Sequence, residues 1–570
     1  MKKTVSTFFT ILCLLSAVFL MGLAFNIQPV KATEIVYIRP DGSIDPATAS
    51  ISSVDNITYT FTDNMLACIV VERSNIVIDG NGHELGSEGV FTRGSGFDLR
   101  YMHANITNIT IKNVTIRDFT CGVDLTHASN NTISGNKIFG CGSGIRLWGP
   151  FSSNNTVSEN HMVDNGISIS GSSNNTISGN YISGSGILVD GEYNDICGNT
   201  IEAPTYVGIR IDGSSHNSLR GNRICSSDMG EGIEIVGCSN CIVSGNNITD
   251  NKWGIGLHSS SNNSIFGNSI LNNEYGISIK DSLNNSIHCN SFLNNEVQEC
   301  TITLPYLKNS WDDGYPSGGN YWSDYKGTDS DNDGIGDTPY VIDANNTDNY
   351  PLMGTFSGFN ATPEHHVQTI CNSTISDFQF DGMAISFSVT GEDGTVGFCR
   401  VCIPTALMND TFRVFVDGIE ILPSPEPLPC SNGTHNYLYF AYEHSTHKVV
   451  IASEPPTISI LSPENKTYGV RDVSLTFIVS ESTSWIGYSL DGQANMTITG
   501  NKTLSDLSEE LHSLIVYAND TAGNMGASEM VYFTIEIQQE EPFPTWIIAV
   551  IVIIGVVGAV VFVYFTKFKK

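Results

Sequence analysis

Basic residues are scarce in this chain of 570 residues. There are 27 Lys and Arg against 59 Asp and Glu, which gives a formal net charge of −32 at pH 7. A nucleic-acid partner would need a concentration of positive charge, so this balance argues against that class of function and favours a surface that collects divalent cations. Long helical periodicity is also missing, as are tracts rich in Met or His.

The main feature that the chain does contain is a repeat with a period of about 22 residues, between about Asn75 and Cys300. Clear copies read NNTISGNKI from Asn130 and NNTISGNYI from Asn174, and each copy is followed by a Gly-Ile strand such as GIRLW from Gly144. A fixed period in this range indicates a solenoid. Ile alternates with Ser, Thr or Arg, as in a strand with one face on a core, and the regular leucines of a leucine-rich repeat are missing. We therefore predict an all-β protein with a right-handed parallel β-helix of about ten rungs over residues 75–300.

Stacking the copies in register predicts two columns of residues. One is an interior hydrophobic ladder, and the other is an Asn column at a bend, where side-chain amides can bond from rung to rung and the backbone can be left-handed. The ladder is Ile133, Val157, Ile177, Ile196, Leu219, Val243, Ile265 and Ile287, and the Asn column is Asn136, Asn160, Asn180, Asn199, Asn222, Asn246, Asn268 and Asn290.

Both ends of the chain carry long apolar runs. Residues 1–32 have the pattern of a secretory signal peptide, with an uncleaved anchor as the alternative because the run is long. Residues 545–566 are uncharged and precede a basic tail, 567–570, which predicts a transmembrane helix with the tail in the cytoplasm. We expect a single-pass cell-membrane protein whose large N-terminal part is extracellular. The candidate glycosylation sites of that part are Asn56, Asn105, Asn360, Asn409, Asn465 and Asn519.

Two atypical segments flank the repeat, as the exposed ends of a solenoid require. We predict an N-terminal cap over 33–74 and a C-terminal cap over 301–354. The second cap contains a DxDxDGxGD pattern, and alternating carboxylates on such a loop gather calcium. Position twelve is Tyr340 rather than Glu, so the loop resembles those of dockerin and thrombospondin type-3 repeats more than a complete EF-hand. The predicted calcium ligands, with a merely solvated acidic turn as the alternative, are Asp329, Asp331, Asp333, Ile335 and Asp337.

Two further β domains are predicted before the membrane helix. Residues 355–454 hold four cysteines, which in an exported protein more often form two disulfides than a zinc site. Residues 455–538 show short, regularly spaced strands that predict an immunoglobulin-like or fibronectin-like sandwich with Trp485 in its core. The disulfide candidates are Cys371, Cys399, Cys402 and Cys430.

The outward positions of the Gly-Ile strands carry the residue types that act on polysaccharides. Arg146 and Trp148 form a candidate sugar-stacking platform. Carboxylates on adjacent rungs, about 4.8 Å apart, would suit a retaining glycosidase or a lyase. A solvated ladder of compensated charges is the alternative. The weak catalytic candidates are Asp190, Arg210, Asp212 and Glu234. Inside the repeat, Cys238 and Cys241 form a CxxC that we interpret as buried thiols or cross-rung disulfides rather than a metal site.

The repeats, the lead-in IVIDGNGHEL and the cap GGNYWSDYKGTDSDNDGIGDTPYVID resemble the NosD-type β-helix family, over roughly Glu34 to Met353. That family belongs to a carbohydrate-binding and sugar-hydrolase β-helix group, and the likeness is greatest to membrane-anchored archaeal surface proteins. The family name implies periplasmic copper binding, which would need clustered Cys, Met or His ligands, so we do not expect copper. We predict a surface protein whose β-helix binds a polysaccharide, a glycan or cell-surface proteins without catalysis. The alternatives are a polysaccharide-active enzyme and, third, a copper-binding protein.

Overall fold

The computed structural model describes residues 34–87, 92–100, 106–227, 230–302, 307–408, 412–422, 430–480, 482–520, 524–538 and 544–567. The expected signal peptide, the sequons at Asn105 and Asn409, and the basic tail after Lys567 lie outside these residues. The chain divides into two compact units, which are described separately. The first comprises residues 1–376, 389–405 and 423–447, and the second comprises 377–388, 406–422 and 448–570.

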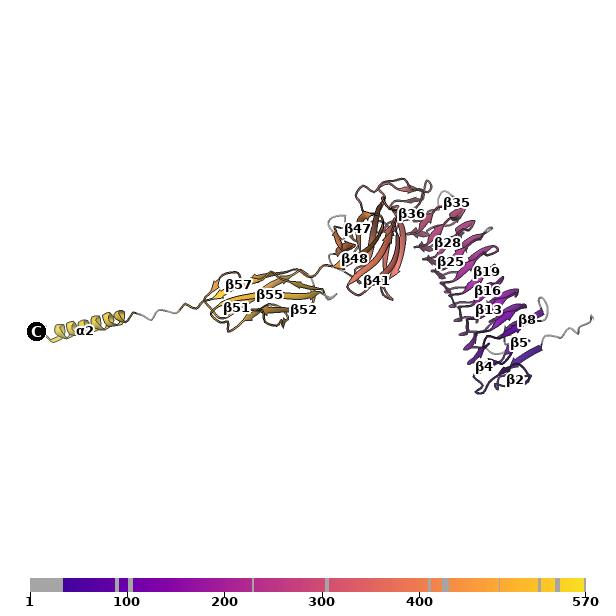
Figure 1. Ribbon diagram of the computed structural model, residues 1–570, viewed down its shortest axis with the longest axis horizontal. Helices are drawn as coiled ribbons and strands as arrows, with labels where there is room; N and C mark the ends of the chain where they lie inside the picture. The colour runs from indigo at the N-terminus through magenta and orange to yellow at the C-terminus, as the bar shows by residue number, and fades with distance from the viewer. Residues whose placement is uncertain are drawn as a thin grey trace, which may run out of the picture. The chain divides into compact units, whose positions relative to one another are not determined.

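A parallel β-helix of about ten turns occupies most of the first unit, and its stacked strands are seen side by side in Figure 1. Each turn contributes one strand to each of three parallel sheets, which we name A, B and C. Sheet A, the sheet of the Gly-Ile strands, consists of β1 (Glu34–Ile38), β5 (Met65–Val71), β8 (Thr92–Asp98), β11 (Phe119–Asp124), β14 (Ser143–Trp148), β17 (Ile167–Ser170), β20 (Ile187–Asp190), β23 (Val207–Asp212), β26 (Glu231–Val236), β29 (Trp253–His258), β32 (Tyr275–Lys280) and β35 (Val297–Ile302), with β2 (Ile44–Asp45) antiparallel to β1.

Sheets B and C have shorter strands, most of them three residues long. Sheet B consists of β3 (Ile51–Ser52), β4 (Thr58–Phe61), β6 (Ile76–Asp79), β9 (Ile109–Lys112), β12 (Thr132–Ser134), β15 (Thr156–Ser158), β18 (Thr176–Ser178), β21 (Asp195–Cys197), β24 (Ser218–Arg220), β27 (Ile242–Ser244), β30 (Ser264–Phe266) and β33 (Ser286–His288). Sheet C consists of β7 (Glu84–Gly86), β10 (Thr115–Arg117), β13 (Lys137–Phe139), β16 (His161–Val163), β19 (Tyr181–Ser183), β22 (Thr200–Glu202), β25 (Arg223–Cys225), β28 (Asn247–Thr249), β31 (Ser269–Leu271), β34 (Ser291–Leu293) and β36 (Tyr321–Trp322).

The predicted interior ladder is confirmed. All of its residues are fully buried, and the register of sheet B pairs each with the next, as in Ile133 with Val157 and Val157 with Ile177. Because side chains alternate across a strand, the neighbours Thr132 and Ser134 point outward. Burial of these stacked aliphatic side chains provides the hydrophobic stabilisation that a single turn could not provide alone.

The predicted Asn column is also confirmed, at the bend between sheets B and C. Each side chain is buried, and its Nδ2 donates to Oδ1 of the next Asn at 2.8–3.0 Å. The left-handed backbone, however, is not at these residues. It lies at Asn130, Asn154 and Asn174, where φ is 57–59° and the chain turns into sheet B. The bend between sheets B and C has its own left-handed residue one position before each column Asn, such as Gly135 or Glu159, so the column residues are selected for their amides instead.

A second Asn column, which we did not predict, lies at the bend between sheets A and B. Its Nδ2 groups donate to the next Oδ1 at 2.9–3.2 Å, but Cys241 occupies the column position in one turn and interrupts it. Cys238 similarly stands where the neighbouring turns have Ser214 and Ser260. Both thiols are buried within the same turn. The column consists of Asn131, Asn155, Asn175, Asn194, Asn217, Asn263, Asn285 and Asn309.

The C-terminal cap continues both columns before it closes the helix. Asn290 donates to Asn320 at 3.0 Å, and the backbone N–H of Asn320 donates to Asp348 at 2.7 Å. Burial raises the pKa of Asp348 to about 7. Trp322 stacks on Phe292 with a centroid distance of 4.4 Å, and so covers the last turn of the core. The short strands β37 (Tyr340–Val341) and β38 (Thr347–Asp348) complete this cap.

Further antiparallel sheets follow the β-helix. A five-stranded sheet within the first unit has the order β39 (Thr355–Asn360), β40 (His366–Cys371), β43 (Val396–Pro404), β47 (His435–Glu443) and β46 (Cys430–Ser431). A second five-stranded sheet, most of it in the second unit, has the order β41 (Thr374–Phe380), β42 (Ala384–Thr390), β48 (Thr446–Ser453), β44 (Phe412–Val416) and β45 (Ile419–Ile421).

The last β region has two sheets that share one hydrophobic core. Tyr488 and Phe533 are its buried aromatic residues. The expectation that Trp485 fills this core is wrong. Trp485 is three residues before Tyr488 on the same strand and so faces the other way, where its ring covers Gly487 and its Nε1 donates to Thr497. The strands are β49 (Ile458–Ser462), β51 (Val473–Val479) and β54 (Lys502–Leu504) in one sheet, and β50 (Thr467–Tyr468), β57 (Val531–Ile535), β55 (Leu511–Asp520), β52 (Thr483–Leu490), β53 (Met496–Ile498) and β56 (Met525–Ala527) in the other.

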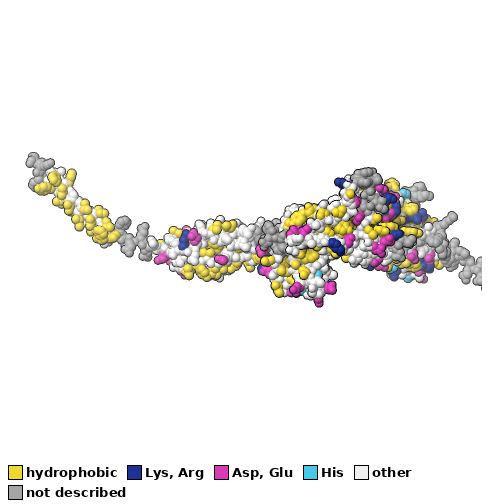
Figure 2. Space-filling view, turned by 90° about the horizontal axis from the view of Figure 1, so that it is seen from above, with side chains coloured by type: hydrophobic (Ala, Val, Ile, Leu, Met, Phe, Trp, Pro, Cys, Tyr) yellow, Lys and Arg dark blue, Asp and Glu magenta, His cyan; other side chains and the backbone are white. Residues whose placement is uncertain are grey.

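The helix α2 (Thr545–Lys567) follows these sheets, and hydrophobic side chains run along it (Figure 2). Its 23 residues, at about 1.5 Å each, extend about 35 Å, which exceeds the hydrocarbon thickness of a bilayer of about 30 Å. By length and composition this helix is able to cross a membrane.

The interrupted column leads to a test of its energetic role. Replacing Cys241 with Asn returns an acceptor to Asn217, so in reducing buffer the free energy of unfolding should rise by about 1 kcal/mol, the usual value of one hydrogen bond. Urea unfolding of the full-length protein in detergent measures this change. Cys197→Asn, at an outward position of β21, is the matched control and should change stability by less than about 0.5 kcal/mol. A destabilised Cys241→Asn variant would contradict the role assigned to the column.

Candidate functional site

The outer face of sheet A carries two rows of side chains that follow the helix axis. In the first row, Arg146 pairs in register with Ser168, which pairs with Leu188. The row continues through Arg210, Glu234 and Gly256. The second row, two residues further along each strand, contains Trp148, Ser170, Asp190, Asp212, Val236, His258 and Lys280.

Three of the four catalytic candidates form one ion-paired group. The Arg210 guanidinium donates from Nη1 to Glu234 Oε2 at 2.6 Å and from Nη2 to Asp212 Oδ2 at 2.8 Å. Asp190 does not take part, because its carboxylate accepts from Ser170 Oγ at 3.3 Å. The structure therefore brings Asp212 and Glu234 together through Arg210, whereas Asp190, next to Asp212 in the second row, bonds to Ser170 instead.

The electrostatic setting differs between the two ion-paired carboxylates. Glu234 is partly buried, and burial, with Glu231 as a second cause, raises the pKa of Glu234. The Asp212 side chain is more exposed than that of Glu234. The hydrogen bond from Arg210 to Asp212 is the largest cause of the raised pKa of Arg210. Arg210 therefore remains a cation at the centre of the group.

The predicted stacking platform is held in place by two contacts. The Arg146 guanidinium lies 4.3 Å from the Trp148 ring centroid, and the indole Nε1 donates to Ser168 Oγ at 3.0 Å. Trp148 nevertheless remains 42% exposed. An exposed aromatic ring of fixed orientation offers a flat apolar surface for a ligand.

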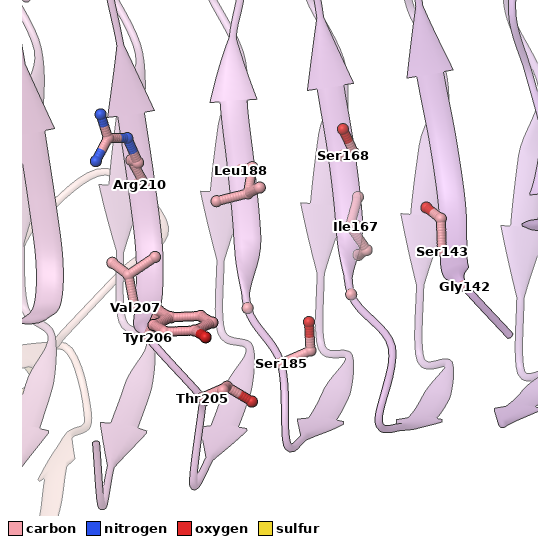
Figure 3. Close-up of a pocket in the computed structure, with 12 residues that line it drawn as sticks. Gly142, Ser143, Ile167, Ser168, Ser185, Leu188, Thr205, Tyr206, Val207 and Arg210 are labelled. Atoms are coloured by element: carbon pink, nitrogen blue, oxygen red, sulfur yellow. The ribbon is translucent and has the colours of Figure 1, made fainter. Parts of the chain in front are cut away.

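A groove of about 400 Å³ crosses β14, β17, β20 and β23 beside this platform (Figure 3). Hydroxyl groups and small residues make up much of its lining, and Tyr206, which is 77% exposed, lies along one side. Our sequence analysis missed Tyr206 and Leu188. The connection from β22 to β23 is longer than the corresponding connection in each of the three preceding turns. An aromatic residue in this longer connection was the sequence signal that could have identified Tyr206. The groove is lined by Gly142, Ser143, Gly166, Ile167, Ser168, Ser185, Gly186, Leu188, Thr205, Tyr206, Val207 and Arg210.

Three of the predicted calcium ligands in the acidic loop lie close together. Carboxylate oxygens of Asp329, Asp331 and Asp333 lie within 4.8 Å of one another. Burial raises the pKa of both Asp329 and Asp333. Asp337 instead accepts hydrogen bonds from the backbone and side chain of Ser330, and Ile335 contributes a backbone N–H that donates to Asp333. Calcium binding by this loop remains a prediction, with the first three Asp residues as its core.

The four cysteines of the predicted disulfides are free thiols in this structure. Cys371 and Cys399 are register partners on β40 and β43, so this pair is the nearest to a disulfide. Cys402 and Cys430 lie on either side of Tyr437, which pairs with each of them in register. Disulfide formation therefore stays a prediction.

The described candidate asparagines for glycosylation differ in exposure. Asn56, Asn360 and Asn465 are exposed, whereas Asn519 is half-buried on β55. The exposed sites remain the better acceptor candidates, because a glycan needs an accessible side chain.

The stacked parallel strands with their Asn columns define the class of parallel β-helix proteins. Within this class, the β-helical part of the chain matches the NosD family model, described as periplasmic copper-binding protein (NosD), over residues 48–230 and 203–327. Halomucin of Haloquadratum walsbyi (strain DSM 16790 / HBSQ001) is 36% identical over 100 residues, which are 15% of this chain and 1% of halomucin. The chain thus spans only a very small part of that relative.

Similar solved structures include other β-helix proteins at low identity. A tailspike protein mutant of E. coli bacteriophage HK620 in complex with a pentasaccharide is 11% identical, with a TM-score of 0.38, covering 70% of this chain and 86% of that one. A mutant of the periplasmic alginate epimerase AlgG is 16% identical, with a TM-score of 0.27, covering 44% and 68%. The fibronectin(III)-like modules of Clostridium thermocellum CbhA are 15% identical, with a TM-score of 0.14, covering 31% and 98%.

The family description raises the question of copper. Soft thiolate and thioether ligands select Cu(I). Among the described residues, the two His, Cys, Asp and Glu clusters with metal-binding spacing contain no sulfur: one is Glu231, Glu234 and His258, and the other is the acidic loop. These two donor sets of the described residues therefore do not fit a copper(I) site.

Calcium should stabilise the protein through the acidic loop. A ligand that binds only the folded state stabilises it by about 2.7 kcal/mol at a hundredfold excess over its Kd. The melting temperature of the full-length protein in detergent should therefore rise with millimolar calcium and fall with chelator. Asp331→Asn should abolish the rise, whereas Asp337→Asn, the matched control outside the carboxylate cluster, should retain it. A melting temperature that changes with neither calcium nor chelator would contradict calcium binding by this loop.

Proposed function

We propose that this chain is a membrane-anchored surface protein whose β-helix binds a carbohydrate chain along sheet A without cleaving it. The observation that carries the proposal is the groove across β14, β17, β20 and β23, with Tyr206 at its side and Trp148 beside it. This groove runs along the helix axis, so successive turns, about 4.8 Å apart, offer equivalent positions to the successive units of a chain ligand.

The chemistry of the groove suits sugars. Ser143, Ser168, Ser185 and Thr205 offer hydroxyl groups that both donate and accept hydrogen bonds, as sugar hydroxyl groups do. Exposed aromatic rings pack against the apolar faces of sugar rings. The Arg210 charge at the end of the groove is offset by Asp212 and Glu234, so this end favours a neutral, strongly polar unit.

The ion pairs favour binding over catalysis. A retaining glycosidase needs two carboxyl groups about 5 Å apart, one of them as a nucleophile that is free to attack. Here Arg210 holds both Asp212 and Glu234, and Asp190 accepts a hydrogen bond from Ser170. One observation favours the enzyme as a second candidate: burial raises the pKa of Glu234, and a general acid requires such a shift.

The membrane anchor in this proposal is α2. Its apolar length suffices to cross a bilayer, and Lys567 at its C-terminal end would lie on the cytoplasmic side. The preceding domains would then face the outside, where they could meet a polysaccharide, a glycan or another cell-surface protein.

A glycan array probed with the full-length protein in detergent should identify ligands, and calorimetry should then measure their Kd. Trp148→Ala and Tyr206→Ala should each weaken binding by about tenfold or more, as expected for aromatic anchors. Tyr193→Ala is the matched control, because Tyr193 is 53% exposed but stacks on His216 away from the groove, and it should leave binding unchanged. Equal losses in all three variants would place the ligand elsewhere.

Asp212→Asn separates binding from catalysis. An exposed ion pair contributes about 0–1 kcal/mol, so stability should change little and glycan Kd should stay within about threefold. Mass analysis of the bound glycan should show no new chain ends. The enzyme would instead produce shortened chains, and its turnover should fall by about two orders of magnitude or more in this variant. Asp195→Asn, an exposed carboxylate paired with Arg220 on sheet B, serves as the matched control.

A further inference from the structure

A mixed cluster of one imidazole and two carboxylates lies on sheet A, next to the groove. Glu231 and Glu234 come from β26, and His258 comes from the adjacent strand β29. One ligand atom from each lies within 4.8 Å of the others, and Glu231 Oε1 lies 3.0 Å from His258 Nε2. Glu234 was among the outward residues expected from the sequence, whereas Glu231 was not considered.

The backbone opposite Glu234 makes room for Glu231. Gly256 pairs with Glu234 in register, and a Cβ atom on Gly256 would lie 2.6 Å from Glu231 Oε1. The Glu231 side chain thus occupies the space that a side chain at position 256 would fill. Because Glu231 and His258 both lie over this gap on fixed strands, the carboxylate and the imidazole are held together by the fold.

One oxygen of this cluster has no partner. Glu231 Oε2 is buried and accepts no hydrogen bond from the described residues, and the side chain as a whole is only 14% exposed. A buried carboxylate oxygen without a donor is costly. Glu231 Oε1 already contacts His258. Glu231 Oε2 would be stabilised by a cation or a hydrogen-bond donor, which the described residues do not supply.

We propose that Glu231, Glu234 and His258 form a binding site for Zn²⁺, a divalent transition-metal ion of borderline softness. Imidazole nitrogen combined with carboxylate oxygen is a ligand set of zinc, whereas calcium and magnesium take oxygen ligands. Zinc–ligand bonds of about 2.1 Å put tetrahedral ligand atoms about 3.4 Å apart, so small side-chain movements would close the cluster. Three protein ligands leave a fourth position for water or for an oxygen of a bound molecule.

This site does not depend on the groove binding sugar, but Arg210 connects the two. Arg210 lines the groove and donates to Glu234 Oε2. A bound cation would repel the guanidinium, so metal occupancy should alter the position of Arg210 within the groove.

Isothermal titration of the full-length protein in detergent with ZnCl₂, in the presence of excess calcium, tests this site. We expect one zinc ion per cluster with a Kd in the micromolar range or tighter. Glu231→Gln and His258→Gln should each weaken zinc binding by at least about tenfold. Asp195→Asn, the exposed carboxylate on sheet B, is the matched control and should leave the Kd unchanged. Zinc binding that survives both cluster variants would overturn the proposal.

Two further measurements protect the test from misfolding and from the thiols. Circular dichroism and melting curves identify any variant that fails to fold. The two variants also differ in what they change: His258→Gln keeps the buried Glu231 carboxylate, whereas Glu231→Gln removes it. Co²⁺ gives visible absorption bands whose intensity and position report ligand type. Bands of a nitrogen and oxygen site, lost in His258→Gln, support the proposal. Sulfur-to-cobalt charge-transfer bands, lost in Cys241→Asn instead, would assign the metal to the Cys238–Cys241 pair and overturn it.

Discussion

The buried rung-to-rung hydrogen bond between asparagine side chains is the interaction on which the rest of the first unit depends. A bend between two short strands leaves backbone carbonyl groups without strand partners, and burying them would be costly. The side-chain amide of Asn160 satisfies one such carbonyl group, Ile133 O of the preceding turn, and also donates to Asn180 Oδ1 of the next turn. Each turn therefore fixes the register of its neighbours, and strands of only three residues can stack in a regular array.

This register explains which parts of the structure were accessible to sequence reasoning. Period-two alternation and a constant spacing place Ile177 inside and Arg210 outside, because one repeat fixes the direction of every side chain in the stack. The neighbouring pairs on sheet A follow in the same way, and Arg210 does lie opposite Glu234. What alternation does not give is rotamer choice. Arg210 turns toward Asp212 and Glu234 rather than toward Asp190, and only the packed structure decides between these partners.

The missed residues share a different cause. Glu231 fits beside His258 because Gly256 has no side chain, and Tyr206 lines the groove because its turn is longer than the preceding ones. Neither feature is part of the repeat, so the positions that the copies share do not predict either residue. The prediction for Trp485 was wrong for a different reason. A large aromatic residue in a sandwich strand suggests a core position, but Trp485 is three residues from Tyr488, and this spacing places the two side chains on opposite faces. In the acidic loop the spacing pattern predicted five ligands, whereas the fold of the loop directs Asp337 to Ser330.

The way in which the cap receives the two asparagine columns has a consequence for the behaviour of the protein at high concentration. A parallel β-helix that ended at β33 would present bare strand edges and unsatisfied amides identical to those inside it, and such an end is a template for another chain. Asn320 and Asn309 accept the last bonds of the columns, while Asp348 and Asn346 take the place of a further turn. The same amide pairing that builds the stack is thereby terminated, so both asparagine columns have a defined end and offer no free amide there to another chain.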